Sequence, residues 1–236
     1  MTARACAHRG DSGVLRENTL PAVRSALDKG AAVVEIDVRL TGDGDVVVLH
    51  DPTLERLWGD PREIESVRTA ELLALGGPDH RPPLLAEVLP LFAAGTSRLV
   101  IDMDAARPAA PAHAVVAASG VTVDWCGHLA AMRVLREIDA DARIWLPWGR
   151  EEPPKAADLA ELSPVLINAP FPVVDHRFVH TVHDLGLPVT AWTIDDEGDL
   201  TRALDLGIDT ITTNRLDRLQ AMIAARSASI EKELNR

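Results

Sequence analysis

The chain has 236 residues, of which 47% are hydrophobic and 25% are charged, as is typical of one globular domain with a full-sized core. This composition excludes a disordered chain, and the formal net charge of -12 excludes nonspecific nucleic-acid binding because it repels a phosphate backbone. Two cysteines, Cys6 and Cys126, form neither a disulfide framework nor a zinc-site spacing, and we interpret them as buried apolar side chains.

The first nine residues include Arg4, His8 and Arg9 and no apolar run that could be the core of a signal peptide. No segment of the sequence approaches the roughly 18 apolar residues of a membrane span. We therefore expect a cytoplasmic protein without stable membrane anchoring. The net charge favours neither a monomer nor a dimer, so the oligomeric state stays open.

Short apolar runs recur along the chain, and most of the gaps between them have room for a helix, which is typical of parallel strands joined by crossover helices. In chain order, the predicted strands are residues 5–8, 32–38, 98–103, 121–125, 143–146, 165–168, 189–193 and 209–213. The predicted helices, of which the first follows a cap-like Asn18-Thr19, are residues 21–29, 84–92, 130–138, 175–185 and 200–206. This alternation predicts a (β/α)8 TIM barrel.

One further predicted strand, residues 46–50, breaks the alternation. It follows the second strand across only residues 41–45, which are too few for a crossover connection. We therefore predict an extra hairpin strand after strand 2, with Asp43-Gly44 as a two-residue turn. Such a turn would place His50 opposite Asp37, and a bulge would shift this pairing by one residue.

Residues 51–83 lack a clear strand and are rich in glycine, proline and charged residues, with one helical segment around residues 69–75. We interpret them as a small insertion at the rim of the barrel. No repeat or linker divides the chain, so we predict a single domain over residues 1–236. Its tail, residues 227–236, has the character of a fraying helix end.

Polar residues collect at the carboxyl ends of several of the predicted strands, where barrels of this type form their active sites. These residues are His8-Arg9-Gly10, Glu35 and Asp37, His50-Asp51, and Asp102 with Asp104. Glu35 and Asp37 stand two apart, so they share one face of an otherwise apolar strand. They are the clearest anomaly of the sequence, because unpaired buried carboxylates are costly.

Three carboxylates, Glu35, Asp37 and Asp102, offer only oxygen ligands, which suit a hard divalent cation such as Mg²⁺ or Ca²⁺ and leave positions for phosphate oxygens. His8 and His50 are then candidates for a general acid and a general base, because a free imidazole titrates near neutral pH.

Arg9 is a candidate for holding a phosphate oxygen through charge-assisted hydrogen bonds. Taken alone, each candidate also has a structural interpretation, such as a hydrogen-bonded histidine, an ion-paired core carboxylate or, for Gly10, a turn glycine. Their joint projection onto one rim favours a functional site.

The chain resembles the glycerophosphodiester phosphodiesterases, which belong with the phosphoinositide phospholipase C-like phosphodiesterase barrels. The residues that carry the resemblance are Ala7-His8-Arg9-Gly10, Glu17-Asn18-Thr19, Ala22, Gly30, Glu35-Ile36-Asp37-Val38, Thr41, Asp43-Gly44, Val47-Val48, His50-Asp51-Pro52-Thr53-Leu54, Arg56, Pro83-Leu84-Leu85, Glu87-Val88-Leu89, Gly186-Leu187-Pro188-Val189, Ala191-Trp192-Thr193 and Ile211-Thr212-Thr213-Asn214. The match is most specific in the N-terminal part.

The resemblance implies a metal-dependent hydrolase that cuts a small-molecule glycerophosphodiester into sn-glycerol 3-phosphate and an alcohol. His8 and His50 would be its general acid and base, in an order that the sequence leaves open, and Arg9 would bind phosphate. The attacking group could be water or the glycerol 2-hydroxyl.

The resemblance also implies a cation site and a substrate wall. Glu35 and Asp37 would bind the divalent cation together with a carboxylate on a later strand, here Asp102. Trp192 would form the aromatic wall for the glycerol part of the substrate. A tryptophan at a strand end is equally often a packing residue.

The chain departs from the family where the family usually shows Glu-x-Lys, because it has Asp102-Met103-Asp104. Asp104 replaces a cation that would face the phosphate with a potential anion. We hypothesise that Lys155 or Arg150, in the proline-rich loop after residue 146, restores the missing charge and contacts the substrate.

Two alternatives to a glycerophosphodiesterase stay open. One is a phospholipase D-like phosphodiesterase that acts on lysophospholipids or other phosphodiesters. The other, suggested by Asp104, is a barrel that binds phosphodiesters without cutting them. Milder departures at residues 124–127 and at Asn214, where the family often has aspartate, also caution against assuming the usual substrate.

Overall fold

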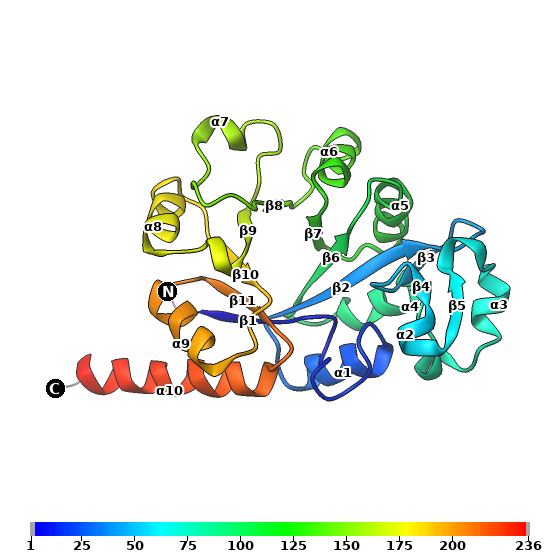
Figure 1. Ribbon diagram of the computed structural model, residues 1–236, viewed down its shortest axis with the longest axis horizontal. Helices are drawn as coiled ribbons and strands as arrows, with labels where there is room; N and C mark the ends of the chain where they lie inside the picture. Colours follow the sequence, from blue (N-terminus) through cyan, green and yellow to red (C-terminus); the bar gives the residue numbers. More distant parts are fainter. Residues whose placement is uncertain (1–2, 235–236) are drawn as a thin grey trace.

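A computed structural model describes residues 3–234 of the chain. Eight parallel strands form a nearly closed barrel with helices around its outside (Figure 1). Around the barrel the strands follow the order β7-β6-β2-β1-β11-β10-β9-β8. The ring is completed between β7 and β8 by an isolated parallel bridge from Trp125 to Ile144. The predicted (β/α)8 TIM barrel is confirmed.

All eight barrel strands overlap the runs predicted from the sequence. They are β1 (Arg4–Ala7), β2 (Val33–Leu40), β6 (Arg98–Met103), β7 (Val123–Gly127), β8 (Trp145–Pro147), β9 (Leu166–Pro170), β10 (Val189–Trp192) and β11 (Thr210–Thr213). Side chains alternate between the two faces of each strand, so apolar residues pack both outward against the helices and inward in the barrel. Cys6 and Cys126 belong to the inward layer and are buried free thiols.

The helices that cover the barrel were only partly predictable. They are α1 (Leu20–Asp28), α4 (Leu85–Val88) with the 3₁₀ helix η3 (Leu89–Phe92), α5 (Ala109–Ser119), α6 (Leu129–Ile138), α7 (Ala156–Leu159), α8 (His176–Asp184), α9 (Glu197–Leu206) and α10 (Leu216–Leu234). Of these, α1, α4 with η3, α6, α8 and α9 overlap predicted helices. Thr19 caps α1 by accepting a hydrogen bond from the backbone N–H of Ala22.

Helix α10 continues through the predicted tail 227–236 as far as Leu234, and Asn235 and Arg236 lie outside the described residues, as do Met1 and Thr2. None of the helices described between residues 3 and 234 combines the length and the apolar character needed to cross a bilayer.

The extra strand β3 (Val46–Val48) runs antiparallel to β2, which confirms the predicted hairpin. Its predicted register is wrong by one residue, because Val38 pairs with Val48 and Leu49 donates its N–H to the carbonyl of Asp37. The turn holds three residues between Thr41 and Asp45 instead of two, with Gly44 at a φ of 88°. Such a three-residue turn ends in a left-handed residue, for which glycine is best suited. His50 therefore lies one position beyond the residue opposite Asp37.

The segment 51–83 forms a small structure of its own beside β2 and β3 (Figure 1). It contains β4 (Thr53–Leu54), α2 (Glu55–Trp58), β5 (Asp60–Glu63), η1 (Ile64–Ser66), α3 (Thr69–Leu73) and η2 (Pro78–His80). The expectation that this segment lacks strands is wrong, because β4 and β5 pair in an antiparallel sheet. The predicted helical segment is confirmed as α3. Apolar side chains from the segment pack with Val47 and Leu49, which attaches it to the hairpin.

Candidate active site

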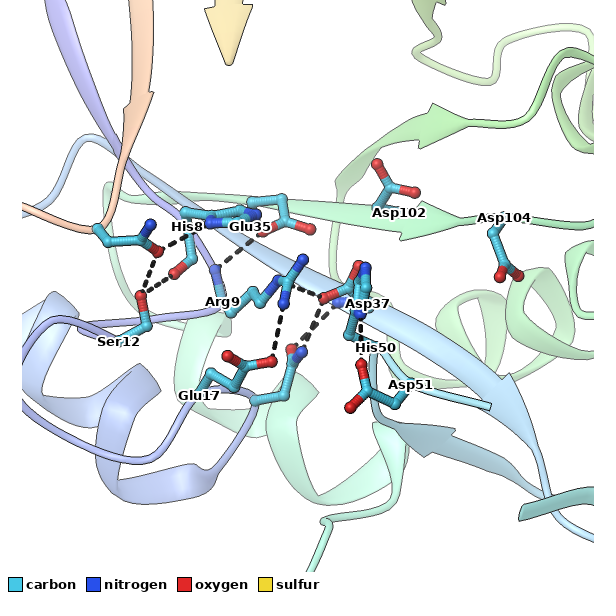
Figure 2. A network of polar contacts seen from close by, with 12 residues as sticks. His8, Arg9, Ser12, Glu17, Glu35, Asp37, His50, Asp51, Asp102 and Asp104 are labelled. Carbon is cyan, nitrogen blue, oxygen red and sulfur yellow. Dashed lines mark hydrogen bonds and ion pairs between the residues drawn. The ribbon is translucent and has the colours of Figure 1, made fainter. Parts of the chain in front are cut away.

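A cavity of about 250 Å³ opens at the carboxyl end of the barrel strands. It brings together almost all of the residues predicted for the site, which come from β1, β2, β6, β10 and the segment after β3. These residues are His8, Arg9, Glu35, Asp37, His50, Asp102, Asp104 and Trp192. Figure 2 shows the imidazoles and carboxylates of this group side by side, with Asp104 at the edge. The structure therefore brings these predicted residues together at one end of the barrel.

Lys155 is the exception among the predicted residues. It lies at the start of α7, where its side chain is exposed and its backbone N–H donates to Asp158. The guanidinium of Arg150 stacks instead over the ring of Trp148, at 4.9 Å from the ring centroid. Neither cation lines the cavity, so the expectation that one of them contacts the substrate is not supported.

Two neighbouring strands place the carboxylates. Glu35 and Asp37 alternate along β2, and Asp37 stands in register with Asp102 on β6. Burial, together with the charges of Asp37 and Asp102, raises the pKa of Glu35 well above its ordinary value. Burial, reinforced by the charge of Asp37, also raises the pKa of Asp102, to about 6. The cavity thus concentrates negative charge that a bound cation would stabilise.

Each of these three carboxylates has one oxygen engaged by the protein and one oxygen left over. Glu35 Oε2 accepts from the backbone N–H of Arg9 at 2.9 Å, and Asp102 Oδ2 accepts from the thiol of Cys126 at 3.2 Å. Asp37 Oδ2 accepts from the side-chain amide of Asn18 at 2.7 Å. Within residues 3–234 the second oxygen of each group has no hydrogen-bond partner.

These donors suit a hard divalent cation, which prefers carboxylate oxygens. Across the part of the chain that the structure describes, however, no three His, Cys, Asp or Glu side chains stand in a ready-made metal cage. The three carboxylates thus have the right chemistry for a cation such as Mg²⁺ or Ca²⁺, but their side chains would have to move closer together to hold it.

Arg9 enters the cavity from the turn that follows β1. Its φ is 58°, a left-handed conformation that is uncommon for a residue with a Cβ. In this conformation its backbone N–H reaches Glu35 while its guanidinium forms ion pairs with Glu17 at 2.8 Å and Asp37 at 3.2 Å. The guanidinium is thus held beside the carboxylates, where it can also meet an anion.

Glu17 and Asn18 carry supporting roles that sequence reasoning did not assign. The Asn18 side chain binds Asp37 twice, since its amide N–H₂ donates to the carboxylate and its oxygen accepts the Asp37 backbone N–H at 3.1 Å. Glu17 pairs with Arg9 and also with Arg56. The only sign of these roles in the sequence is that Glu17 and Asn18 belong to the residues that carry the family resemblance.

His8 is oriented by a chain of hydrogen bonds from β11 and the loop after β10. Its Nδ1 lies 2.8 Å from Oδ1 of Asn214, whose amide N–H₂ donates to Asp195 at 2.7 Å. A carboxylate can only accept, so the Asn214 oxygen must face His8 and Nδ1 must be the donor. Nε2 is left free and lies 4.0 Å from Glu35. Burial and the adjacent Arg9 lower the pKa of His8.

His50 is oriented in the same way by a carboxylate. Its Nδ1 lies 2.8 Å from Asp51, whose pKa is lowered to about 2 mainly by hydrogen bonds from Arg56. Asp51 is therefore ionised at neutral pH and accepts a hydrogen bond from Nδ1–H, which leaves Nε2 of His50 without a protein partner among the described residues. The His50 side chain is 45% exposed, against 18% for His8.

The opposite wall of the cavity is aromatic and amide-bearing. Trp192 is 44% exposed, which is unusual for so large an apolar side chain and favours a contact with ligand. Trp145 and Asn168 also line the cavity and are almost fully buried. Neither had been predicted as a site residue, because a tryptophan and an asparagine within strands carry no distinctive pattern.

The chain matches the model of the glycerophosphoryl diester phosphodiesterase family over residues 8–218. One relative, the Probable glycerophosphodiester phosphodiesterase 2 of Mycobacterium tuberculosis, is 29% identical over 94% of this chain and 91% of that protein. A shorter match, with the glycerophosphodiester phosphodiesterase of Caldanaerobacter subterraneus, is 48% identical but covers only 24% of this chain and 23% of that protein.

Among solved structures, an Oleispira antarctica phosphodiesterase in complex with the product sn-glycerol-3-phosphate has a similar fold. Its TM-score with this chain is 0.83, over 94% of this chain and 97% of the other, at 23% sequence identity.

Proposed function

Because the chain belongs to the glycerophosphoryl diester phosphodiesterase family, whose members are phosphoric diester hydrolases, we propose that it hydrolyses glycerophosphodiesters to sn-glycerol 3-phosphate and an alcohol. The main support is a single cavity that joins two imidazoles with free Nε2 atoms to an arginine and three carboxylates. These are the groups needed to bind a phosphodiester and to move protons on both sides of it.

A divalent cation, Mg²⁺ or Ca²⁺, belongs to this proposal. Glu35, Asp37 and Asp102 would hold it through their unpartnered oxygens. When bound, such an ion stabilises the negative charge that grows on a phosphoryl oxygen in the transition state.

The two histidines would then divide the proton transfers. His8 has a lowered pKa and is neutral at pH 7, so its Nε2 would remove the proton from the attacking hydroxyl of water or of the glycerol itself. His50, in its doubly protonated form, would give the Nε2 proton to the departing alcohol oxygen while Nδ1–H stays hydrogen-bonded to Asp51. Asn214 and Asp51 fix the ring orientation in each case, which keeps both Nε2 atoms available.

Arg9 and Trp192 would bind the substrate. The Arg9 guanidinium would donate charge-assisted hydrogen bonds to a phosphate oxygen while remaining tied to Glu17. The exposed face of Trp192 would pack against the carbon atoms of the glycerol part.

A product-specific assay tests this function. The purified protein is incubated with glycerophosphocholine, glycerophosphoethanolamine, a lysophospholipid or a chromogenic bis-phosphodiester, each with Mg²⁺, Ca²⁺ or a chelator. We expect release of sn-glycerol 3-phosphate from the glycerophosphodiesters, loss of activity in chelator, and loss in His8→Ala and His50→Ala. Preferential cleavage of the lysophospholipid would indicate the phospholipase D-like alternative. A His8→Ala variant as active as wild type would refute the assigned centre, and turnover of no substrate with any cation would indicate a binding protein.

A further inference from the structure

Arg39 faces the same cavity but has no role in the scheme above. It follows Glu35 and Asp37 at alternate positions of β2, so its side chain emerges on the same face of the strand. The side chain is 17% exposed. Its Nε donates to the backbone carbonyl of His50 at 2.6 Å, which holds the guanidinium at the edge of the cavity.

The partner of this guanidinium is Asp104. Asp37 on β2 stands in register with Asp102 on β6. Arg39, two residues after Asp37, forms an ion pair through Nη2 with Asp104, which directly follows the end of β6. The anion that replaces the usual lysine of the family is therefore matched by a cation on the neighbouring strand. The pair offsets the negative charge of Asp104, which is the residue that suggested a barrel that binds phosphodiesters without cutting them.

The two cavity arginines differ in how firmly they are committed. Arg9 is 16% exposed and is shared between Glu17 and Asp37, which are themselves 16% and 14% exposed. The carboxylate that holds Arg39 is 59% exposed. An ion pair so open to water contributes little, so exchanging Asp104 for another oxyanion has a small cost. Within residues 3–234 the Nη1 group of Arg39 has no hydrogen-bond partner and can meet a ligand.

We propose that Arg39 is a second phosphate-binding residue, which takes a phosphoryl oxygen of the substrate and is held in place by Asp104 when no substrate is bound. The proposal rests on the proposed function, because it assigns a further contact to the same site. Arg39 lines the cavity, whereas Lys155 does not, so Arg39 can supply the positive charge that the phosphate of the substrate would need there.

Three variants test the proposal: Arg39→Gln, Asp104→Asn, and the double variant Arg39→Gln with Asp104→Lys. We expect Arg39→Gln to raise the inhibition constant of sn-glycerol 3-phosphate about 10- to 100-fold, as for the loss of a hydrogen-bonded ion pair. Asp104→Asn should lower this constant a few-fold, because it removes an anion that competes for the guanidinium. The double variant should recover part of the lost affinity, because Asp104→Lys supplies a cation at the edge of the cavity.

A control separates phosphate binding from a general effect of losing a rim arginine. Arg107→Gln removes an exposed arginine that pairs with Glu65 and does not line the cavity. We expect the inhibition constant of this variant to equal that of wild type. Unfolding temperatures measured for all variants would reveal a loss of structure in Arg39→Gln. In that event the proposal is decided by Asp104→Asn, for which we expect a lower inhibition constant than for wild type.

The hydrogen bond from Arg39 to the His50 carbonyl offers a competing role in positioning. If Arg39→Gln lowers kcat while the inhibition constant stays at the wild-type value, Arg39 only positions His50 and the proposal is overturned. No recovery in the double variant, or weaker product binding by Asp104→Asn, would also overturn it.

Calorimetric titration with inorganic phosphate needs no turnover and so separates this proposal from the proposed function. Phosphate that binds wild type clearly more tightly than Arg39→Gln supports the role of Arg39, even for a protein without hydrolase activity. Equal affinities of the two proteins for phosphate would refute it.

Discussion

Replacing Asp102 by asparagine should stabilise the protein in the absence of divalent cations, because burial and the neighbouring Asp37 oppose the charge of this carboxylate. A pKa of about 6, against an ordinary value of 3.8, corresponds to about 3 kcal/mol of lost folding free energy at pH 7. A group with a raised pKa stabilises the fold below its ordinary value of 3.8, and this contribution is lost as the pH rises through 6. Asparagine resembles the protonated acid and can still accept the hydrogen bond from Cys126.

Thermal unfolding in chelator measures this effect. For a chain of this size, about 3 kcal/mol would raise the unfolding temperature of Asp102→Asn by roughly 6–12 °C at pH 7. The difference should shrink to about 1.5 kcal/mol at pH 5, where much of the wild-type carboxyl is already protonated. Added Mg²⁺ or Ca²⁺ should stabilise wild type more than the variant. An Asp102→Asn protein that is no more stable than wild type in chelator at pH 7 would refute the electrostatic reasoning.

Three further predictions concern the surroundings of the site. Gly127→Ala should lower both the folding stability and the affinity for a divalent cation, because a Cβ at this φ of 108° would lie 2.6 Å from Asp102 Oδ1. Thermal unfolding measures the first effect and cation titration the second. An unchanged cation affinity would contradict this prediction. Arg56→Ala should destabilise the protein by about 1 kcal/mol at pH 7. Since Arg56 lowers the pKa of Asp51 from 3.8 to about 2, this stabilisation is present above pH 3.8 and lost as the pH falls through 2, so acid unfolding curves of variant and wild type should converge at low pH. Trp192→Ala should raise the KM for glycerophosphocholine about 10-fold while sparing a chromogenic bis-phosphodiester that has no glycerol, and an equal loss on both substrates would argue against a glycerol contact.

The barrel could be predicted because its strands are short, apolar and buried on both faces, which leaves a signal in the sequence at every strand. Helix α5 was missed because its sequence is almost uniformly small and apolar and contains Pro111, so it shows no helical periodicity. Strand β5 was missed because its Asp-Pro-Arg-Glu sequence has none of the alternation of a half-buried strand. These elements depend on tertiary contacts more than on local pattern.

The site residues were predictable where strand ends bring them together, whereas pairings between side chains were not. The sequence pattern assigns the cation that balances Asp104 to Lys155 or Arg150, whereas in the structure Asp104 pairs with Arg39, which lies two residues after Asp37 on the same face of β2. Recognising it required the register of β2 against β6, which pairs Asp37 with Asp102 and so brings Arg39 close to Asp104. The hold of Asn18 on Asp37 was equally invisible, because it depends on the conformation of the segment between β1 and α1.

The electrostatics of the cavity and its chemistry follow from the same arrangement. Four carboxylates, Glu35, Asp37, Asp102 and Asp104, face two guanidinium groups. Burial first, and then the charges of Asp37 and Asp102, raise the pKa of Glu35, so a positive charge placed among these groups would stabilise the ionised form. An anionic phosphodiester would meet a cavity that repels it unless that charge is supplied first. A dication held by the carboxylates would bring the cavity near neutrality and leave the guanidinium groups free to draw in the phosphate. On the proposed function, the carboxylates of β2 and β6 that oppose one another's charge would therefore make cation binding a condition for substrate binding.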